Sequence, residues 1–404
     1  MDIWITGIGS ICSAGAGSNA LFDATLASSI STRTIKVSSG KEKSNLPVCS
    51  IDDSSFDLPR FNGINKLDRS SKLAIVAGNE AWQQSGLNVS QIEPDRTSVI
   101  VGTSRGPVGK WEETYQRQLS GKKQLPSLAA TGTMAALSGS LSQFLGVTGT
   151  SLTLSSTCSS GASAIGMGAS LILGGSCDVS VVGGSESVIN EAIISVMKSA
   201  GLLGNDPVPD KTCKPFDIGR NGLVVGEGAG FLVIEASEHV MKRGGVPLAR
   251  LSGWASSLSQ SGKVGVEESG SGLARTIKNT ISMAEIEPSD ISYINAHGTG
   301  TILNDLCESK AFNQVVGLSD VPLSSIKPIT GHCLGASPAL EAVLSVISLK
   351  EGSLPHTANL ENIDPQINLN LIKGQPQKSN QNHVLSTSLG FWGNHASLLF
   401  SSVS

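Results

Sequence analysis

The chain has 404 residues, more than one minimal hydrophobic core requires, so its length predicts two structural units or one large one. Only 15% of the residues are charged and 46 are glycine, which is typical of a compact, heavily buried enzyme with many tight turns. The formal net charge of −4 argues against the broad basic surface of a general nucleic-acid-binding protein.

The cysteine content favours a reducing compartment. Seven scattered cysteines, none paired at Cys-x-x-Cys spacing, indicate neither a disulfide framework nor a zinc site. The first residues, MDIWITGIGS, lack the basic start of a secretory signal, and no apolar run is long enough to span a membrane. We therefore expect a soluble cytoplasmic protein that binds neither membrane nor nucleic acid.

Short apolar runs alternate with helix-like segments along the chain. The predicted strands include Ile3–Thr6, Ser98–Val101, Leu152–Leu154, Val179–Val182, Phe231–Ile234 and Tyr293–Asn295. The predicted helices include Lys72–Ser85, Ala162–Leu173, Leu273–Ala284 and Ala339–Leu349. Such alternation predicts an α/β architecture with largely buried strands. Two stretches rich in Ser and Gly, Ser38–Asn45 and Ser256–Ser271, are expected to be weakly ordered.

An internal similarity indicates a chain built from two related halves. Cys158 opens the string CSSGAS and His332 opens the string HCLGAS, and each string follows a predicted strand and leads into an apolar helix. Ser98–Ser104 likewise resembles Tyr293–Thr301, since both are strands that break at Gly-Thr. We predict one half over residues 1–245, with the cysteine, and a second over 246–404, with two histidines. A pseudo-twofold axis would bring the two helix starts together.

Cys158 is the candidate nucleophile. It precedes a helix of small residues, and the positive end of a helix dipole lowers the pKa of a thiol. The free N–H groups of the first turn can also bind a developing oxyanion. The alternative is a buried, inert cysteine, which is the commoner outcome for a lone Cys.

Two of the six histidines occupy glycine-rich turns after predicted strands. His297 lies in NAHGTGT and His332 in KPITGHCLG, where the backbone can approach a ligand closely. Either one alone is more often a structural histidine that bonds to the backbone. A cysteine together with two such histidines indicates covalent catalysis.

These motifs together resemble the signature of the β-ketoacyl-ACP synthases. The matching strings are SSTCSSGASA, HGTGT followed by Asn304, Asp305 and Glu308, and KPITGHCLGAS. WITGIGSICSAG, KPFDIGRNGLVVGEGAGFLVIE and SLGFWGNHASLLF extend the resemblance over nearly the whole chain. The resemblance implies a thiolase-like fold, with five layers (α/β/α/β/α) in two pseudo-symmetric halves, and usually a homodimer.

The resemblance also implies a set of site residues. Cys158 would accept the acyl group, and His297 and His332 would donate hydrogen bonds to the malonyl thioester oxygen as it becomes an enolate. Lys327 would lie near His332 and tune the field, and Glu308 would hold the loop and pair with the basic groups. The alternative for these last two is an ordinary buried ion pair.

Further residues would handle the substrate arm. The backbone N–H groups of Cys158 and Phe391 would form the oxyanion hole, and Phe391 would gate the acyl pocket; the alternative is a core aromatic. Thr299 and Thr301 would bind the phosphopantetheine arm, although threonines also form turns. No metal or diffusible cofactor is implied, because the pantetheine belongs to the acyl carrier protein.

The sequence departs from the family pattern at three places. The gate loop, usually Gly-Phe-Gly-Gly-Thr-Asn, has Trp392 in place of a glycine, and the region 262–268 lacks the threonine of a His-x-Thr-x-Pro segment. Trp111 falls where the family limits the depth of the acyl pocket, so we expect it to contact the substrate and favour short or flat acyl groups. The alternative is that Trp111 anchors a dimer interface.

The implied activity is decarboxylative Claisen condensation in a dissociated fatty-acid, polyketide or polyene pathway. The implied partners are an acidic acyl carrier protein and a second chain, either a copy or a related synthase-like subunit. A candidate docking cluster consists of Arg60, Lys66, Arg69 and Lys72, unless these residues form only a solvated helix face. The alternatives are a CoA-dependent thiolase or acyltransferase and a subunit that is active only with a partner chain. A thiolase would need a second cysteine as base, but the position of Cys333, one residue past His332, is better explained by packing.

Overall fold

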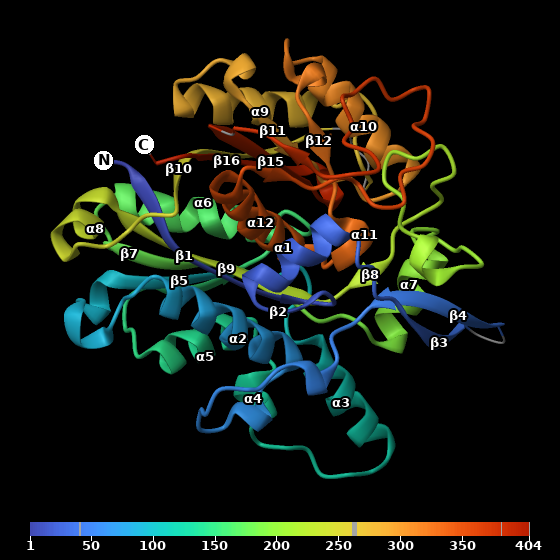
Figure 1. The fold of residues 1–404 in the computed structure, drawn as a ribbon. Coiled ribbons are helices and arrows are strands. Elements are labelled where there is room, and N and C mark those ends of the chain that lie inside the picture. Colours follow the sequence, from blue (N-terminus) through green and yellow to red (C-terminus); the bar gives the residue numbers. More distant parts are fainter. Residues whose placement is uncertain (40–41, 261–264, 381, 404) are drawn as a thin grey trace.

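The computed structural model describes residues 1–39, 42–260, 265–380 and 382–403. Helices and sheets alternate in five layers, with α9 and α10 outermost at one side, α6 and α12 in the middle, and α2 and α5 outermost at the other (Figure 1). These helices are α2 (Arg69–Gln84), α5 (Ala135–Leu145), α6 (Ser160–Leu173), α9 (Ser271–Ala284), α10 (Ile302–Asn313) and α12 (Ser337–Glu351). The layered α/β fold is the one predicted.

One sheet belongs to the first half of the chain. Its strands are β1 (Ile3–Cys12), β5 (Thr97–Gly102), β6 (Ser151–Leu154), β7 (Val179–Glu186) and β9 (Gly228–Ala236). They lie in the order β6-β5-β7-β9-β1. The pairs β1–β9 and β9–β7 are antiparallel, whereas β7–β5 and β5–β6 are parallel.

The second half repeats this pattern. Its strands are β10 (Ala249–Leu258), β11 (Tyr293–Asn295), β12 (Leu323–Ser324), β15 (His383–Leu389) and β16 (Asn394–Ser401), in the order β12-β11-β15-β16-β10. The parallel and antiparallel pairs fall at the same positions as in the first half. The two sheets are joined where β1 pairs with β10. Two pseudo-symmetric halves are therefore present, and the position of the boundary at residues 245 and 246 stays a prediction.

The repeat places Cys158 and His332 at equivalent points. In each half the third strand, β6 or β12, leads through a loop to a middle helix, α6 or α12. The predicted similarity of Ser98–Ser104 to Tyr293–Thr301 corresponds to the second strands, β5 and β11. Symmetry thus brings the loop of the cysteine and the loop of the histidine to the centre of the molecule.

Small residues allow the middle layer to pack this closely. A Cβ atom added to Gly166 of α6 would lie 2.8 Å from the ring of Trp254, and one added to Gly168 would lie 2.3 Å from Val182. At the helix start, a Cβ on Gly161 would lie 2.9 Å from the carbonyl oxygen of Gly335. The glycines of the CSSGAS helix therefore permit direct backbone contact between the halves.

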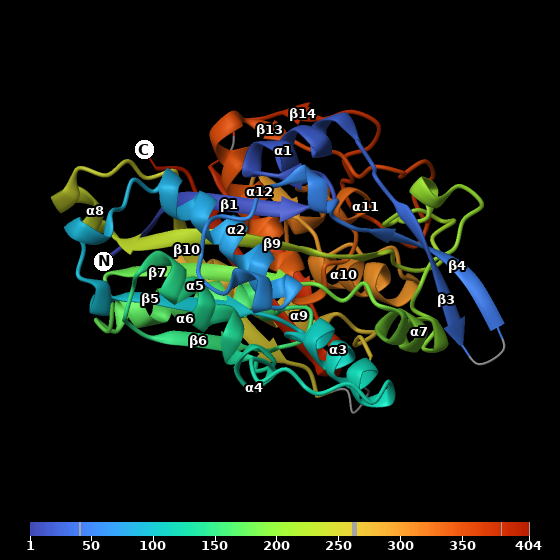
Figure 2. The same ribbon diagram turned by 90° about the horizontal axis from the view of Figure 1, so that it is seen from below.

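The remaining elements surround this frame (Figure 2). They are β2 (Gly15–Ala16), β3 (Arg33–Ser39), β4 (Glu42–Cys49), β8 (Val225–Gly226), β13 (Ser353–Leu354), β14 (Gln377–Lys378), α1 (Ser18–Ala27), α3 (Val108–Leu119), α4 (Leu128–Thr131), α7 (Glu191–Ser199), α8 (Ser237–Arg243) and α11 (Lys327–Thr330). Within the described ranges, the structure has no helix with both the length and the apolar character needed to cross a membrane.

The first of the two stretches expected to be weakly ordered lies mostly in strands. Residues 38–39 and 42–45 belong to β3 and β4, which form an antiparallel hairpin; residues 40–41 lie outside the described part. In the second stretch, residues 256–258 belong to β10 and residues 261–264 lie outside the described part.

Candidate active site

Cys158 lies in a tight turn immediately before α6. Thr157, next to it, has a φ of 55°, a left-handed conformation that is unusual for a β-branched residue. Ser160 holds the turn, because its Oγ donates to the Thr157 carbonyl at 2.5 Å and accepts from the Ser156 amide at 2.9 Å. The thiol therefore occupies a constrained position at the amino end of a helix.

Cys158, His297 and His332 line one cavity of about 330 Å³. The two imidazole rings are 5.1 Å apart between centroids and nearly perpendicular, at 83°. Thr299, Thr301 and Phe391 also line this cavity. Much of the rest of the wall is apolar and comes from Met197, Leu202, Leu223, Val266, Ile302, Leu303, Leu334 and Leu389.

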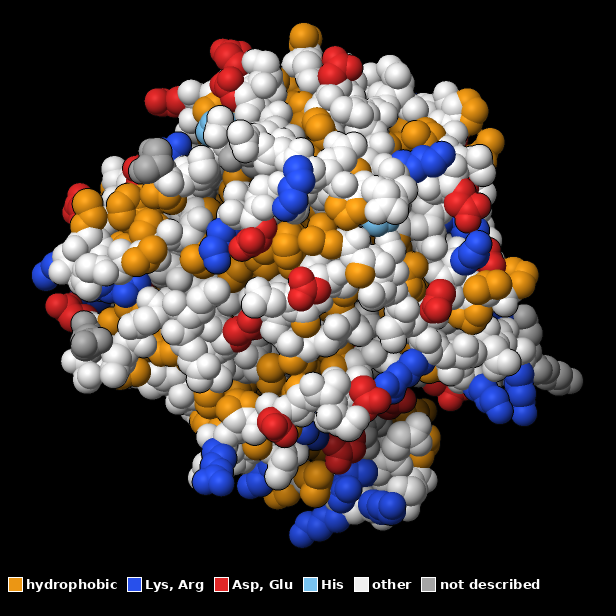
Figure 3. All heavy atoms as spheres, viewed as in Figure 1, with side chains coloured by type: hydrophobic (Ala, Val, Ile, Leu, Met, Phe, Trp, Pro, Cys, Tyr) orange, Lys and Arg blue, Asp and Glu red, His pale blue; other side chains and the backbone are white. Residues whose placement is uncertain are grey.

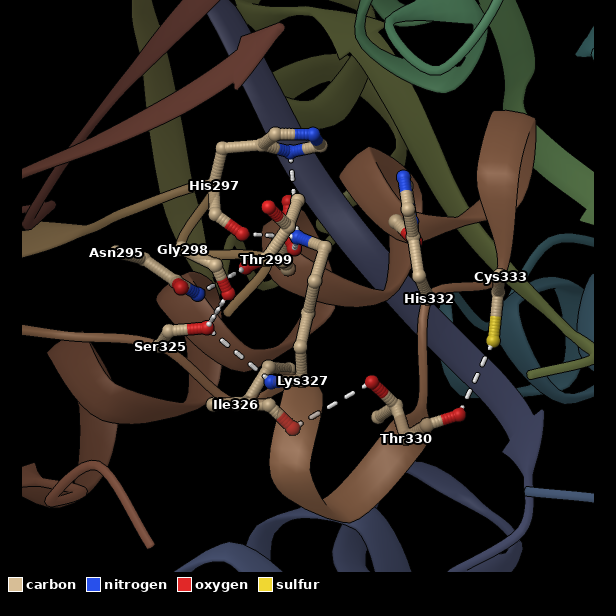
Figure 4. Close-up of polar contacts among 12 residues, drawn as sticks. Asn295, His297, Gly298, Thr299, Ser325, Ile326, Lys327, Thr330, His332 and Cys333 are labelled. Carbon is tan, nitrogen blue, oxygen red and sulfur yellow. Dashed lines mark hydrogen bonds and ion pairs between the residues drawn. The ribbon is translucent and has the colours of Figure 1, made fainter. Parts of the chain in front are cut away.

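A buried ammonium group orients His297. Lys327 Nζ lies 3.2 Å from His297 Nδ1 and also donates to the His297 carbonyl (Figure 4). Because an ammonium group only donates, Nδ1 accepts and the ring proton is on Nε2. Lys327 was expected beside His332, but its direct contact is with His297. Its carboxylate partner is Glu341 on α12, at 2.5 Å.

His332 is held by its backbone and by a hydroxyl. Its N–H donates to the Val224 carbonyl at 2.7 Å, and its carbonyl accepts from Gly226 at 3.0 Å, which adds a strand-like bridge beside β8. Its Nδ1 lies 3.1 Å from Ser337 Oγ. A hydroxyl can donate or accept, so this contact permits either tautomer of His332.

Burial sets the protonation of the three groups. It raises the pKa of the Cys158 thiol to about 12, against a lowering by the Lys327 charge. Burial and Lys327 also lower the pKa of both His297 and His332 well below the usual value. At neutral pH the site therefore contains a thiol and two neutral imidazoles.

Glu308 and Asp305 hold the HGTGT loop. Glu308 accepts from the amides of His297 at 2.8 Å and Gly298 at 2.6 Å, and burial raises its pKa to about 7. Asp305 accepts from the Thr299 amide at 3.1 Å. Glu308 thus holds the loop as expected. Its hydrogen-bond partners are amides and a hydroxyl, so the predicted pairing of Glu308 with a basic group is wrong, and Lys327 pairs with Glu341 instead.

Comparison with known proteins gives the family. A family profile described as Beta-ketoacyl synthase, N-terminal domain, matches residues 1–239, and the profile for the C-terminal domain matches residues 248–361. The chain belongs to the β-ketoacyl synthase family.

Individual members of the family resemble this synthase over most of its length. Nodulation protein E of Rhizobium leguminosarum bv. trifolii is 32% identical over 86% of this chain and 85% of the relative. The 3-oxoacyl-[acyl-carrier-protein] synthase 2 of Staphylococcus aureus is 32% identical over 83% of this chain and 84% of the relative.

Solved ketosynthase structures share the fold. The ishigamide ketosynthase/chain length factor matches with a TM-score of 0.91 and 26% identity, over 100% of this chain and 99% of that one. A type II PKS acyl-carrier protein in complex with its ketosynthase, bound to the hexaketide, matches with a TM-score of 0.89 and 26% identity, with the same coverage. The thiolase-like fold predicted from the sequence is therefore confirmed.

The gate turn of this synthase, Phe391–Gly393, lies against the nucleophile turn. The carbonyl of Phe391 accepts from Thr157 Oγ1 at 3.4 Å. A Cβ on Gly390 would lie 2.0 Å from Thr157 Oγ1 and 3.1 Å from the Cys158 nitrogen, so this close approach requires glycine. Trp392 has a φ of 62° and is 62% exposed, so a bulky side chain occupies a conformation that favours glycine.

Trp111 and Arg69 differ from what was predicted for them, one as a substrate contact and the other as part of a docking cluster. Trp111 is absent from the cavity wall; it is 63% exposed on α3, and its Nε1 donates to the Gly132 carbonyl. This placement corrects the expectation of a substrate contact in the single chain, and the dimer-interface alternative stays a prediction. In the basic cluster, Arg69 is paired with Asp53 and with Glu227, so its charge is compensated.

Cys333 does not share the cavity of the synthase either. Its sulfur donates to the Thr330 carbonyl at 3.3 Å and points away from the His332 ring (Figure 4). The thiolase alternative therefore lacks a second cysteine at this position.

Two buried acids of the site were missed in the sequence. Glu341 interrupts the apolar helix SPALEAVLSVISL, and Glu186 ends the apolar strand VSVVGGSE. Glu186 accepts from Thr103 Oγ1 at 3.0 Å, from the Ser104 amide at 2.6 Å and from the Gly335 amide at 3.2 Å. The available signal was a charged residue inside a buried element, which requires a partner.

Proposed function

We propose that this synthase catalyses decarboxylative Claisen condensation between an acyl group on Cys158 and a malonyl group on an acyl carrier protein. The observation that carries the proposal is the single cavity that Cys158, His297 and His332 share with an apolar wall. The wall suits an acyl chain, and the three polar groups suit transfer of a thioester.

Acyl transfer to Cys158 needs a proton acceptor, since the thiol is protonated at rest. When His332 Nδ1–H donates to Ser337, its Nε2 is free to take the thiol proton. The sulfur then attacks the thioester carbonyl, and the backbone N–H groups of Cys158 and Phe391 stabilise the oxyanion. The carbon–sulfur bond to the carrier breaks, and the carrier thiol leaves with the proton from His332.

Condensation requires hydrogen-bond donors in place of a proton acceptor. The Nε2–H of His297, fixed by Lys327, and the other tautomer of His332, with Ser337 donating, bond to the malonyl thioester oxygen. The carbon–carbon bond to the carboxylate breaks and CO₂ leaves. The electron pair of that bond stays on the malonyl carbon and forms an enolate, which the two donors stabilise. The enolate carbon attacks the acyl thioester carbonyl, and the N–H groups of Cys158 and Phe391 stabilise the oxyanion. The Cys158 thiolate then leaves and takes a proton from solvent water.

The other predicted residues would bind the substrate arm or position the catalytic groups. Thr299 and Thr301, whose Oγ1 atoms are 2.9 Å apart at the cavity wall, would bond to the phosphopantetheine arm. Lys327 and Glu308 would act through the loop of His297, and Phe391 would gate the cavity. The phosphopantetheine comes with the carrier, and the proposed steps call on no metal or other cofactor. The reaction would take place in the cytoplasm.

The surface offers places for both protein partners. Lys and Arg side chains gather at the end of the molecule where α3 and α4 lie (Figure 3), and Lys122 and Lys123 are exposed in the connection between these helices. We propose that this end attracts the acidic carrier.

A second chain would pair along the open edge of β6. This strand is the last in its sheet, and exposed apolar side chains occur on it and on α3, namely Leu152, Trp111, Tyr115 and Leu119. The second chain would be a copy or a related synthase-like subunit, since the ishigamide neighbour is a ketosynthase/chain length factor.

Intact-mass measurement with acyl carriers tests the function. We expect the acyl mass on the wild type, no adduct on Cys158→Ala, and a normal adduct but roughly 10²-fold slower condensation for His297→Ala. An adduct without any condensation would favour the acyltransferase, and condensation only after adding a related chain would favour the two-subunit enzyme. Acylation of Cys158→Ala at the wild-type rate would overturn the proposal.

A further inference from the structure

A second buried cluster lies outside the cavity. His395, the second residue of β16, is 2% exposed, and its Nε2 lies 2.7 Å from Ser259 Oγ. Ser259 Oγ in turn donates to Glu267, which also accepts from Ser271 Oγ at 2.6 Å and from the Gly272 amide at 3.1 Å. Ser259, Glu267 and His395 are named the latch here.

The backbone around the latch is shaped to admit it. A Cβ on Gly272 would lie 2.0 Å from Ser259 Oγ, 2.7 Å from Glu267 Oε2 and 2.8 Å from His395 Nε2. Any larger residue at 272 would displace all three groups. The Ser259 amide also donates to the Gly393 carbonyl at 2.8 Å, so the latch is tied to the gate turn by the backbone as well.

The proton positions in the latch are fixed by chemistry. The Glu267 carboxylate only accepts, so the Ser259 hydroxyl donates to it and must accept from His395 Nε2–H. Burial lowers the pKa of His395 to about 4, which leaves the ring neutral at neutral pH. Among the residues that the structure describes, the charged or titratable groups around the ring are Glu267, Arg275 and His297. Its Nδ1 has no hydrogen-bond partner among the described atoms.

The latch connects two walls of the catalytic cavity. Gly265 and Val266, immediately before Glu267, line one wall, and Gly390 and Phe391, just before the start of β16, line another. None of the three latch residues lines the cavity itself. The hydrogen bonds of the latch therefore hold the two walls together on the side that faces away from the cavity.

We propose that the latch positions the gate turn, and thereby sets both how easily Phe391 moves aside and how well its amide is placed during condensation. This inference rests on the proposed function, in which Phe391 gates the cavity and its amide stabilises the oxyanion. Ser259, Glu267 and His395 are thus positioning residues, which act on the reaction through Phe391. The usual gate-loop pattern of the family has an asparagine where this chain has His395.

Loss of the latch should affect the two half-reactions in opposite directions. The Phe391 amide serves the oxyanion of both half-reactions, but acylation also requires the gate turn to open, and we expect this opening to limit its rate, so a looser turn speeds acylation of Cys158. Condensation requires the Phe391 amide in place, so a looser turn slows it. One lost hydrogen bond corresponds to a change of roughly two- to tenfold in each rate.

The test separates the half-reactions by rapid-quench intact-mass measurement. For Ser259→Ala and His395→Leu we expect acylation by acyl carrier to become about two- to tenfold faster, and condensation of the preformed acyl-enzyme with malonyl carrier to slow by a similar factor. His395→Asn, whose amide can still donate to Ser259, should retain near wild-type rates. The rate at which iodoacetamide alkylates Cys158 in the same variants shows whether the reactivity of the thiol itself has changed.

A matched control lies at the other end of the same strand pair. Ser252 Oγ, on β10, donates to Ser401 Oγ on β16 at 2.5 Å, away from the gate turn, so Ser252→Ala should leave both rates unchanged. Equal slowing of both steps, or no change in either, in Ser259→Ala would overturn the latch. If His395→Leu fails to fold, Ser259→Ala, which removes one oxygen, decides. A wild type that is never acylated would refute the proposed function instead.

Discussion

Removal of the Lys327 ammonium should destabilise the enzyme in a way that depends on pH. Lys327 and Glu341 are 0% and 1% exposed, and Glu341 Oε2 has no partner among the described atoms. In Lys327→Met the Glu341 carboxylate would be buried and unpaired, so it takes up a proton. Burial already raises the pKa of Glu341 to about 7, and loss of the lysine raises it further.

The magnitude follows from the proton uptake. In the unfolded chain Glu341 ionises with a pKa of about 4.3, so full protonation in the folded state costs about 4.4 kcal/mol at pH 7.5 and about 1.6 kcal/mol at pH 5.5. With a folded pKa of about 7 the wild type already bears about 3.5 and 1.6 kcal/mol of these costs, so the variant loses about 0.9 kcal/mol more at pH 7.5 and almost nothing more at pH 5.5. Because the folded pKa is raised, stability is lost as pH rises. We expect a fall in Tm of about 1 °C at pH 7.5 and none at pH 5.5.

Thermal unfolding of wild type and Lys327→Met at pH 5.5 and 7.5 measures this difference. The matched control is Lys327→Met with Glu341→Leu, which removes both charges and should recover most of the stability at either pH. It should not recover condensation, because His297 Nδ1 still lacks its donor. An equal loss of stability at both pH values would refute the assignment of the cost to Glu341.

Three further outcomes are expected. Trp392→Gly should raise the unfolding free energy by about 0.5–1 kcal/mol in a denaturant titration, whereas Trp392→Ala, which keeps the left-handed strain, should not. Between pH 8 and 6 the condensation rate of acyl-enzyme should stay within about twofold, since the pKa of His297 and of His332 is lowered; an ordinary histidine would give a fall of about fourfold by stopped-flow. Reversal of Lys122 and Lys123 to glutamate should raise KM for acyl carrier about tenfold with kcat unchanged, and an unchanged KM would exclude this docking end.

Much of the fold was predictable because the middle helices and central strands have strong patterns. The predicted strand Tyr293–Asn295 coincides with β11, and the predicted helices lie within two or three residues of their observed ends. The strands β10, β15 and β16 were missed. Their sequences, such as ARLSGWASSL and HVLSTSL, mix serine with apolar residues, because small side chains are needed between closely packed layers.

The site was predictable where motifs carry it and not where tertiary contacts do. Cys158, His297 and His332 stand in recognisable strings, and repeat symmetry brings two of them together. The partner of Lys327 depends instead on which face of α12 meets the loop, so the sequence could not choose between Glu308 and Glu341. Trp111 was misplaced because the position of α3 at the surface is not encoded in its local pattern.

The two catalytic loops are held by buried carboxylates rather than by their own side chains. Glu308 binds the amides of His297 and Gly298, and Glu186 binds the Ser104 amide of the first half together with the Gly335 amide that follows His332. Burial raises the pKa of Glu186 and of Glu308 to about 7. The separation of the two imidazoles therefore depends on acids that never touch the substrate. Glycine-rich loops suit this arrangement because their exposed amides, not their side chains, are what the carboxylates bind.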